Sequence, residues 1–236
     1  MILAIESSTP CGSVALVSGG KLLGETVLPR ENQVSETFLL AIDRLLGGAG
    51  GPTIVTHVAV SAGPGSFTGL RVGMAAAKGL CFGWNLPIVP VPTLHALASR
   101  FRTEEALLCP VLDARKKEVY TGVFRWVGGR CLRVAPDAVV SPDAIPDRFA
   151  GEKVFFCGDG TVPYGELLRA RMGARALFPA QGVGLPRASA VGFLAEHMIR
   201  SGERKEARTV VPAYLRFSEA EVRRRKEGLA EPKIDN

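Results

Sequence analysis

The run from Gly63 to Trp84, G-P-G-S-F-T-G-L-R-V-G-M-A-A-A-K-G-L-C-F-G-W, constrains the fold more than any other part of the chain. Its first three residues predict a turn, and Ser66 is a favourable N-cap, so a helix is expected over residues 67–84. Arg71 and Lys78 are its only charged residues. A helix that is apolar on nearly all sides must also be covered on nearly all sides.

Four glycines interrupt this predicted helix, at Gly69, Gly73, Gly79 and Gly83. Each costs roughly 1 kcal/mol relative to alanine in a helix interior, so close approach of another backbone is the expected compensation. Two interpretations follow. Either the helix is central in the core of this chain, or one of its sides is covered by another protein.

Hydrophobic periodicity and turn residues predict two series of elements with the same order: three strands, then helix, strand, helix, strand, helix. The first series covers residues 2–6, 13–18, 22–28, 35–46, 57–62, 67–84, 88–91 and 93–100. The second covers residues 107–113, 118–126, 132–140, 143–149, 153–157, 164–172, 174–178 and 188–200. The repeated order indicates an internal duplication.

Two βββαβαβα units with mixed sheets resemble the actin-like ATPase and sugar-kinase (ASKHA) fold, an α/β class. The resemblance implies a nucleotide cleft between the halves, with phosphates held by the turn after the first strand of each half. In this chain those turns carry Glu6, Ser8 and Thr9 in the first half and Asp113 in the second. The second turn continues as A-R-K-K and lacks the glycines that let backbone N–H groups approach a phosphate. We therefore expect a degenerate nucleotide cleft.

The same reading divides the chain into an N-terminal actin-like domain over residues 1–103, a C-terminal actin-like domain over residues 104–210, and a terminal anchor with a charged tail over residues 211–236. The tail carries Arg223-Arg224-Arg225-Lys226 with glutamates interleaved. A solvated charged helix and a surface that contacts RNA or a partner both fit this pattern.

Motifs for independent catalysis are weak. The three histidines are far apart in sequence and none is paired at helical spacing, so no helix-borne metal site is expected. The glycines after residue 62 match neither a dinucleotide fingerprint nor a P-loop. Glu6 and Asp113, each at a strand end, are the best candidate acids, and a magnesium site between them is the hypothesis that they allow.

Composition limits the class of protein further. The chain has 236 residues, is 47% hydrophobic and carries a formal net charge of +6, which permits a nucleic-acid neighbourhood without requiring contact. Five scattered cysteines without a C-x-x-C pair are typical of reduced thiols, and the N-terminus lacks the features of a signal peptide. No membrane span is expected, and we predict a cytoplasmic protein.

Four segments together resemble the TsaB (YeaZ) family: I-L-A-I-E-S-S-T from residue 2, S-A-G-P-G-S-F-T-G-L-R-V-G from residue 61, A-K-G-L from residue 77 and P-A-Y-L-R from residue 212. The resemblance is strong over the first hundred residues. In the second half it depends on element order and the terminal P-A-Y-L-R. It implies a non-catalytic subunit of the machinery that makes threonylcarbamoyladenosine in tRNA, beside the anticodon.

The resemblance further implies that the partner is the catalytic relative TsaD, that the small ATPase TsaE joins the pair, and that homodimers form through the same surface when TsaD is absent. It implies no cofactor or metal and only indirect or weak tRNA contact. The expected interface lies on the helices at residues 35–46 and 67–84. Its expected residues are Phe38, Ile42, Leu45, Phe67, Gly69, Leu70, Arg71, Gly73, Met74, Ala77, Lys78 and Cys81.

Two other functions compete with this scaffold hypothesis. One is a stand-alone ATP-dependent phosphotransferase or ATPase that uses Glu6 and Asp113 in the cleft. The other is a metallopeptidase, which the absence of a histidine pair disfavours.

Overall fold

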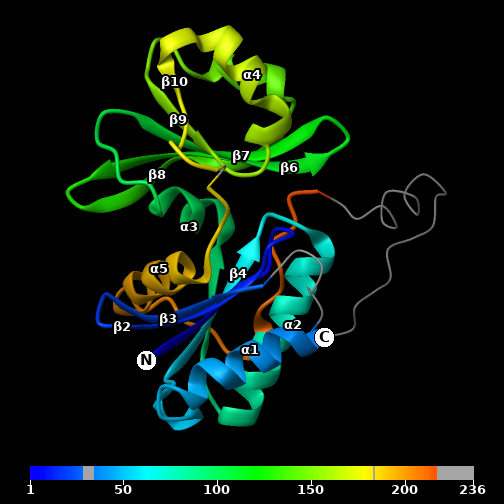
Figure 1. Cartoon of the computed structure of the whole chain (residues 1–236), viewed down its shortest axis with the longest axis vertical. Coiled ribbons are helices and arrows are strands. Elements are labelled where there is room, and N and C mark those ends of the chain that lie inside the picture. Colours follow the sequence, from blue (N-terminus) through cyan, green and yellow to red (C-terminus); the bar gives the residue numbers. More distant parts are fainter. Residues whose placement is uncertain (29–34, 183, 217–236) are drawn as a thin grey trace, which may run out of the picture.

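A computed structural model describes residues 1–28, 35–182 and 184–216 and contains two mixed sheets stacked as two lobes (Figure 1). The first sheet has the order β3-β2-β1-β4-β5 and the second the order β10-β9-β6-β7-β8, which is the same order read from the opposite edge. In each sheet the first three strands are antiparallel and the later two run parallel to the first. The predicted duplication and ASKHA fold are confirmed.

The strands of the first sheet are β1 (Ile2–Glu6), β2 (Ser13–Ser18), β3 (Lys21–Val27), β4 (His57–Gly63) and β5 (Ile88–Pro92). Those of the second are β6 (Leu107–Arg115), β7 (Glu118–Val127), β8 (Arg130–Val140), β9 (Val154–Cys157) and β10 (Ala176–Leu177). All ten overlap the predicted ranges.

The first sheet is covered on both faces. Leu3 and Ile5 of β1 pack on the side of α1 (Ser35–Gly47) and α2 (Phe67–Trp84), whereas Ile2 and Ala4 pack on the opposite side. Side chains alternate along a strand, so a strand with two covered faces is apolar throughout. This explains why the N-terminal run has no polar residue before Glu6.

Two helices are exchanged between the lobes. Helix α3 (Thr93–Ser99) follows the first sheet in sequence, yet its Leu94 and Leu97 pack with residues of the second sheet. Helix α5 (Ala188–Arg200) follows the second sheet in sequence, yet it packs on the first. Figure 1 shows both helices between the two sheets. By packing, α5 therefore belongs with the first lobe, which differs from the sequence division at residues 104–210.

The second lobe departs from the prediction at its helices. In place of a helix over residues 143–149 there are two 3-10 turns, Pro142–Ala144 and Pro146–Arg148. A proline within a helix removes a backbone donor and clashes with the preceding turn, so Pro146 explains the break. Helix α4 (Thr161–Met172) begins three residues earlier than expected and covers the face of the second sheet opposite α3.

After α5 the chain returns along the first lobe. Lys205 forms a bridge with Ile88, and the Ala213 N–H donates to the Ala62 carbonyl at 2.6 Å. The predicted charged tail, including Arg223-Arg224-Arg225-Lys226, lies outside the described residues. Among the described residues, no helix combines the length and apolar character that a membrane crossing requires.

The first lobe caps the N-terminus of α5. Ser13 Oγ accepts from the Ala188 N–H at 2.8 Å, and the Glu25 carboxylate accepts from the Ser189 N–H at 2.9 Å and the Ser189 hydroxyl at 3.1 Å. These bonds satisfy first-turn donors that have no partner within the helix.

We predict that Glu25→Ala lowers the free energy of unfolding by about 1 kcal/mol, as the loss of a cap does, or roughly 2–4 °C in Tm. Lys21→Ala on the same strand is the control, since Lys21 is exposed and its side chain forms no bond across the lobes among the described residues. Thermal denaturation followed by circular dichroism measures both. Equal shifts for the two variants would contradict the capping role.

Candidate functional site

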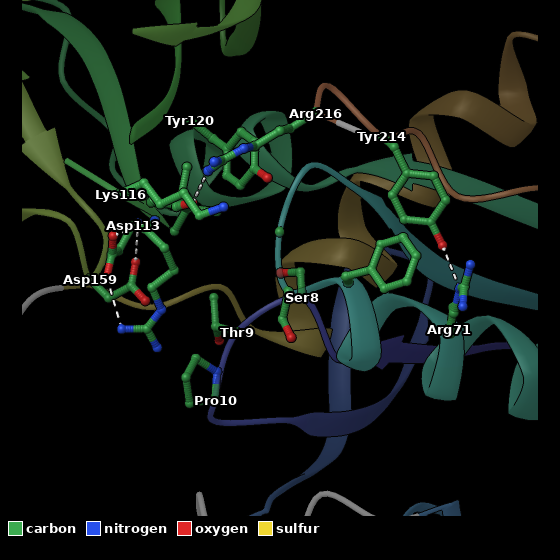
Figure 2. Close-up of a pocket in the computed structure, with 16 residues that line it drawn as sticks. Ser8, Thr9, Pro10, Arg71, Asp113, Lys116, Tyr120, Asp159, Tyr214 and Arg216 are labelled. Atoms are coloured by element: carbon green, nitrogen blue, oxygen red, sulfur yellow. Dashed lines mark hydrogen bonds and ion pairs between the residues drawn. The ribbon is translucent and has the colours of Figure 1, made fainter. Parts of the chain in front are cut away.

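A cavity of about 580 Å³ lies between the two lobes (Figure 2). It is lined by the turn after β1, the start of α2, the β6–β7 hairpin, the turn after β9 and the C-terminal segment. The lining residues that carry the argument are Ser8, Thr9, Phe67, Asp113, Asp159 and Arg216. Ser8, Thr9 and Asp113 thus lie where the sequence predicted them. Glu6 does not line the cavity. It is fully buried at the end of β1.

The first wall is made by close contact between the turn after β1 and the start of α2. The Ser66 N–H donates to the Ser8 carbonyl at 2.7 Å, and Ser66 Oγ accepts from the Gly69 N–H at 3.2 Å, as expected for the predicted N-cap. A Cβ on Gly69 would overlap the Ser7 carbonyl oxygen, and one on Gly73 would overlap Ser7 Oγ. These two glycines therefore let α2 lie directly on the turn.

The second wall is the β6–β7 hairpin. Its turn residues Arg115, Lys116 and Lys117 all have positive φ, at 64°, 54° and 60°. This conformation is unfavourable for residues with a Cβ. The hairpin therefore holds three residues with side chains in a conformation that favours glycine, and two of them, Arg115 and Lys116, line the cavity.

Carboxylates of the protein itself accept from the backbone N–H groups of these turns. The Ser8 N–H donates to Glu6 Oε1 at 2.6 Å, the Arg115 N–H to Asp113 Oδ1 at 2.8 Å, and the Asp113 N–H to Asp159 Oδ1 at 3.0 Å. A bound phosphate would need such donors. In this conformation these three N–H groups are already engaged by the protein's own side chains.

Asp159 is a site residue that the sequence reading missed. It lies in Gly158-Asp159-Gly160, directly after β9, where a polar residue between glycines was the available signal. Burial raises the pKa of Asp159, and the nearby charge of Asp113 adds to this effect. Tyr120, Tyr214 and Arg216 were also missed as lining residues, because they reach the cavity from distant segments.

No metal centre is formed by the described residues, since no group of three or more His, Cys, Asp or Glu side chains is placed to hold an ion. Glu6 and Asp113 are not brought together on the cavity surface, because only Asp113 lines it. The hypothesis of a magnesium site between them is therefore wrong. His57, His95 and His197 lie on β4, α3 and α5, respectively.

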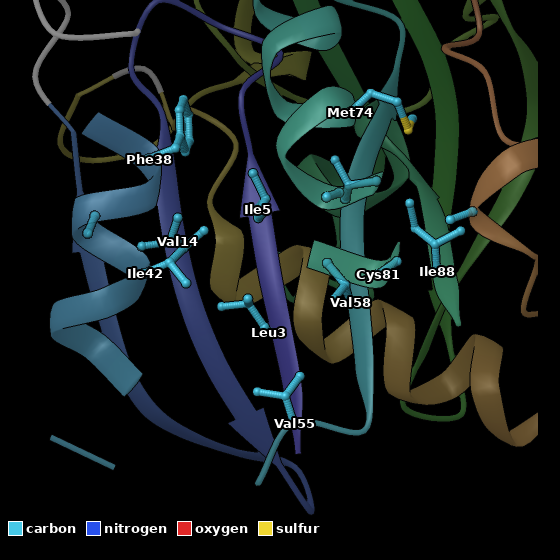
Figure 3. Packing of buried hydrophobic residues seen from close by; sticks show 14 of the residues in the cluster. Leu3, Ile5, Val14, Phe38, Ile42, Val55, Val58, Met74, Cys81 and Ile88 are labelled. Atoms are coloured by element: carbon cyan, nitrogen blue, oxygen red, sulfur yellow. The ribbon is translucent and has the colours of Figure 1, made fainter. Parts of the chain in front are cut away.

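Most of the predicted interface residues are buried within this chain. Figure 3 shows Phe38, Ile42, Met74 and Cys81 directed into the core beneath α1 and α2. Gly69, Leu70, Gly73 and Ala77 are buried as well. These eight residues cannot contact a partner in this conformation, so their assignment to an interface is corrected to the core. Leu45, Phe67 and Lys78 remain partly accessible and Arg71 is exposed.

The outward face of α1 and α2 carries a different set of residues. Both helices cover the same face of the first sheet, so their outer sides share one surface. On α2 this surface has Thr68, Arg71, Ala75, Gly79, Phe82 and Gly83, and on α1 it has Leu39 and Leu40 together with the exposed charged residues Glu36, Asp43 and Arg44. Leu39, Leu40 and Phe82 are 46%, 58% and 65% exposed, respectively. No atom lies within 4 Å of a Cβ built on Gly79 or Gly83.

Fold and cavity together define a duplicated actin-like protein with a cavity between its lobes, in which the protein's own carboxylates accept from backbone N–H groups of the surrounding turns. The chain matches the family model described as TsaD, tRNA N6-adenosine threonylcarbamoyltransferase, over residues 24–224. It is 31% identical to the Bacillus subtilis tRNA threonylcarbamoyladenosine biosynthesis protein TsaB, over 94% of this chain and 96% of that protein.

Other relatives agree with this match. The structure of YeaZ from Pseudomonas aeruginosa is 32% identical with a TM-score of 0.77, covering 91% of this chain and 99% of the other. A tRNA N6-adenosine threonylcarbamoyltransferase from Nitratidesulfovibrio vulgaris is 43% identical, over 53% of this chain and 39% of that protein. The chain therefore belongs to the TsaB (YeaZ) family, within the wider family of the matched model.

The glycines of α2 yield a matched pair of substitutions. We predict that Gly73→Ala destabilises the protein by about 1–3 kcal/mol, because its Cβ meets Ser7 in a packed core. Gly79→Ala should instead stabilise it by about 1 kcal/mol, because the site is open and alanine favours the helix. Urea denaturation measures both free energies. A destabilising Gly79→Ala would contradict this assignment of inward and outward faces.

A second prediction concerns Glu6. Burial raises the pKa of its carboxyl, despite hydrogen bonds from Ser8 that lower it, and Oε2 has no hydrogen-bond partner among the described residues. The folded state therefore binds a proton more tightly than the unfolded state. Stability from this proton is present below about pH 4.5 and is lost as the pH rises through the folded pKa, with a slope of up to about 1.4 kcal/mol per pH unit.

Glutamine at position 6 is neutral at every pH, so Glu6→Gln should remove this part of the pH dependence. The free energy of unfolding of the variant, measured relative to that of the wild type, should therefore increase as the pH rises from 4 to 8. Denaturation at a series of pH values from 4 to 8 measures the effect. Asp43→Gln on the exposed side of α1 serves as the control. Parallel stability curves for Glu6→Gln and wild type would contradict a buried, proton-binding Glu6.

Proposed function

We propose that this protein works in the biosynthesis of threonylcarbamoyladenosine in tRNA, as its relatives named TsaB do, and that it is a non-catalytic scaffold subunit. In this proposal it binds and activates TsaD for threonylcarbamoyl transfer to the tRNA adenosine next to the anticodon. The outward face of α1 and α2 is the docking surface.

The proposal depends chiefly on the exposed position of Gly79 and Gly83 on α2. Each is exposed on α2 with no neighbouring atom that would exclude a side chain, so neither is explained by packing within the chain. Gly79 lies in the helix interior, where glycine costs roughly 1 kcal/mol relative to alanine, and Gly83 lies in the last turn of α2. Close approach of a partner's helix accounts for both residues, because small residues four apart let two backbones come near.

The apolar side chains around these glycines support the same conclusion. Leu39, Leu40 and Phe82 are large, exposed and located on two adjoining helices. Clusters of this kind are typical of protein interfaces, where aromatic and aliphatic anchors supply most of the binding energy. Arg71 at the start of the stripe and Lys78 beside it would lie near the rim.

The cavity between the lobes supports a non-catalytic role for this protein. Backbone donors that a phosphate would need are already bound by the carboxylates of Glu6, Asp113 and Asp159. A stand-alone ATPase or phosphotransferase would need these groups to be rearranged. Titration of the isolated protein with ATP and magnesium tests this alternative, and binding well below millimolar Kd would favour it.

Further parts of the proposal concern assembly. TsaE joins the pair to form a ternary complex, and the same helices form a homodimer when TsaD is absent. Contact with tRNA is indirect or weak, no cofactor is needed, and the protein is located in the cytoplasm.

We predict that Phe82→Glu weakens binding to TsaD by about 2 kcal/mol or more, roughly thirtyfold in Kd, because it places a charge at the centre of the docking surface. Val162→Glu is the matched control, since Val162 is 71% exposed on α4, away from this surface. Isothermal titration of purified TsaD from the same source measures the affinities.

Wild type and Val162→Glu should form one-to-one complexes of equal affinity. Unchanged binding by Phe82→Glu would place the interface elsewhere. Absence of any complex with the wild type at micromolar concentration would overturn the scaffold proposal and return attention to the ATP titration.

A further inference from the structure

The C-terminal segment from Val210 to Arg216 connects the two lobes on the side of α2, where no covalent connection between the sheets passes. The chain crosses between the lobes where α3 follows β5, at residues 92–93, and again before α5, where residues 178–182 and 184–187 are described. Figure 1 shows the terminal segment, in orange to red, rising beside α2 towards the second lobe. It is thus a third, non-covalent link between the lobes.

The segment is firmly attached to the first lobe. Val210 is buried in the core beneath α2, and the Ala213 N–H donates to the Ala62 carbonyl at 2.6 Å. Gly63 has a φ of 111°, and a Cβ there would lie 2.5 Å from the Ala213 carbonyl oxygen. Glycine at this position therefore lets the segment lie directly on the end of β4.

Tyr214 joins the segment to the first turns of α2. Its ring packs against Phe67 at a tilt of 35° with centroids 4.8 Å apart, and its hydroxyl accepts from Arg71 Nε at 3.2 Å. The Arg71 guanidinium also lies 3.9 Å from the centre of the Phe67 ring. Figure 2 shows Tyr214 beside Arg71 at one end of the cavity.

Attachment to the second lobe depends on Arg216. Its Nη1 donates to the Ala114 carbonyl at 2.9 Å and lies 3.3 Å from the Glu118 carboxylate. The two side chains are 26% and 42% exposed, so water competes for this ion pair. The link is therefore strong at its first-lobe end and easily released at its second-lobe end.

We infer that Val210–Arg216 is a latch that holds the lobes in their closed arrangement, and that release of Arg216 from the β6–β7 hairpin opens the cavity. Arg216 lies two residues after Tyr214, so both lobes are held by one short stretch of backbone. The crossings beside α3 and α5 then act as the hinge, since they lie between the sheets away from the latch. This inference does not depend on the proposed docking function.

The latch predicts a change in the distance between the lobes. One spin label is placed at Thr68, exposed in the first turn of α2, and one at Ser141, exposed directly after the end of β8 next to the hairpin. Both positions are changed to cysteine in a Cys11→Ser background, because the other four cysteines are buried and should not react. Pulsed electron–electron double resonance on the full chain, diluted with an excess of unlabelled chain so that distances within one protomer dominate, then measures the distance distribution.

Arg216→Ala should shift this distribution to longer distances and broaden it. Arg208→Ala is the control, because Arg208 precedes the latch, is exposed and pairs only with Glu206 among the described residues. Glu118→Gln, which weakens the ion pair and leaves the Ala114 contact in place, should give a smaller shift in the same direction. Circular dichroism of each variant verifies the fold.

A distribution for Arg216→Ala identical to that of the wild type would overturn the latch. An equal change in Arg208→Ala would also overturn it, because the effect would then not come from the contact with the second lobe. The measurement uses the free chain, so loss of TsaD binding in the earlier titration would leave its outcome unaffected.

Discussion

Contact between α2 and the turn after β1 is the constraint on which the rest of the structure depends. Gly69 and Gly73 bring the helix onto Ser7, and the Ser66 N–H binds the Ser8 carbonyl. This one contact places the start of α2 in the cavity wall and turns Gly79 and Gly83 outward. It also presents Phe67 and Arg71 to the C-terminal segment. Different faces of α2 therefore pack in the core, line the cavity and form part of the exposed surface.

The cavity lies where an actin-like fold brings its two lobes together. Its turns keep the geometry of the fold, because the sheets that position them are needed for stability. The donors of those turns are satisfied by Glu6, Asp113 and Asp159, which belong to the protein itself. These hydrogen bonds occupy backbone donors that a phosphate would otherwise use. The structure thus retains the cleft as a junction between lobes.

Exchange of helices makes the two lobes interdependent. Helix α3 completes the core of the second lobe, and α5 completes the core of the first. Ser13 and Glu25 cap α5 from the first sheet. If either half of the sequence were isolated, its sheet would lack the helix that the other half supplies and one face would be partly uncovered. The two halves are therefore expected to fold as one unit despite their internal repeat.

By itself the sequence determined the order of strands and helices along the chain, the duplication, the N-cap at Ser66 and the turns that carry Ser8, Thr9 and Asp113, because these follow from periodicity and local turn chemistry. It could not assign the faces of α2. A helix of glycine and alanine has apolar residues all round, so periodicity does not distinguish Gly73, packed on Ser7, from Gly79, which faces open space. Tertiary structure alone decided that division, and with it which interface residues were in fact core. It also brought Asp159, Tyr214 and Arg216 to the cavity and carried α5 onto the first sheet, because contacts between residues distant in sequence leave no local pattern.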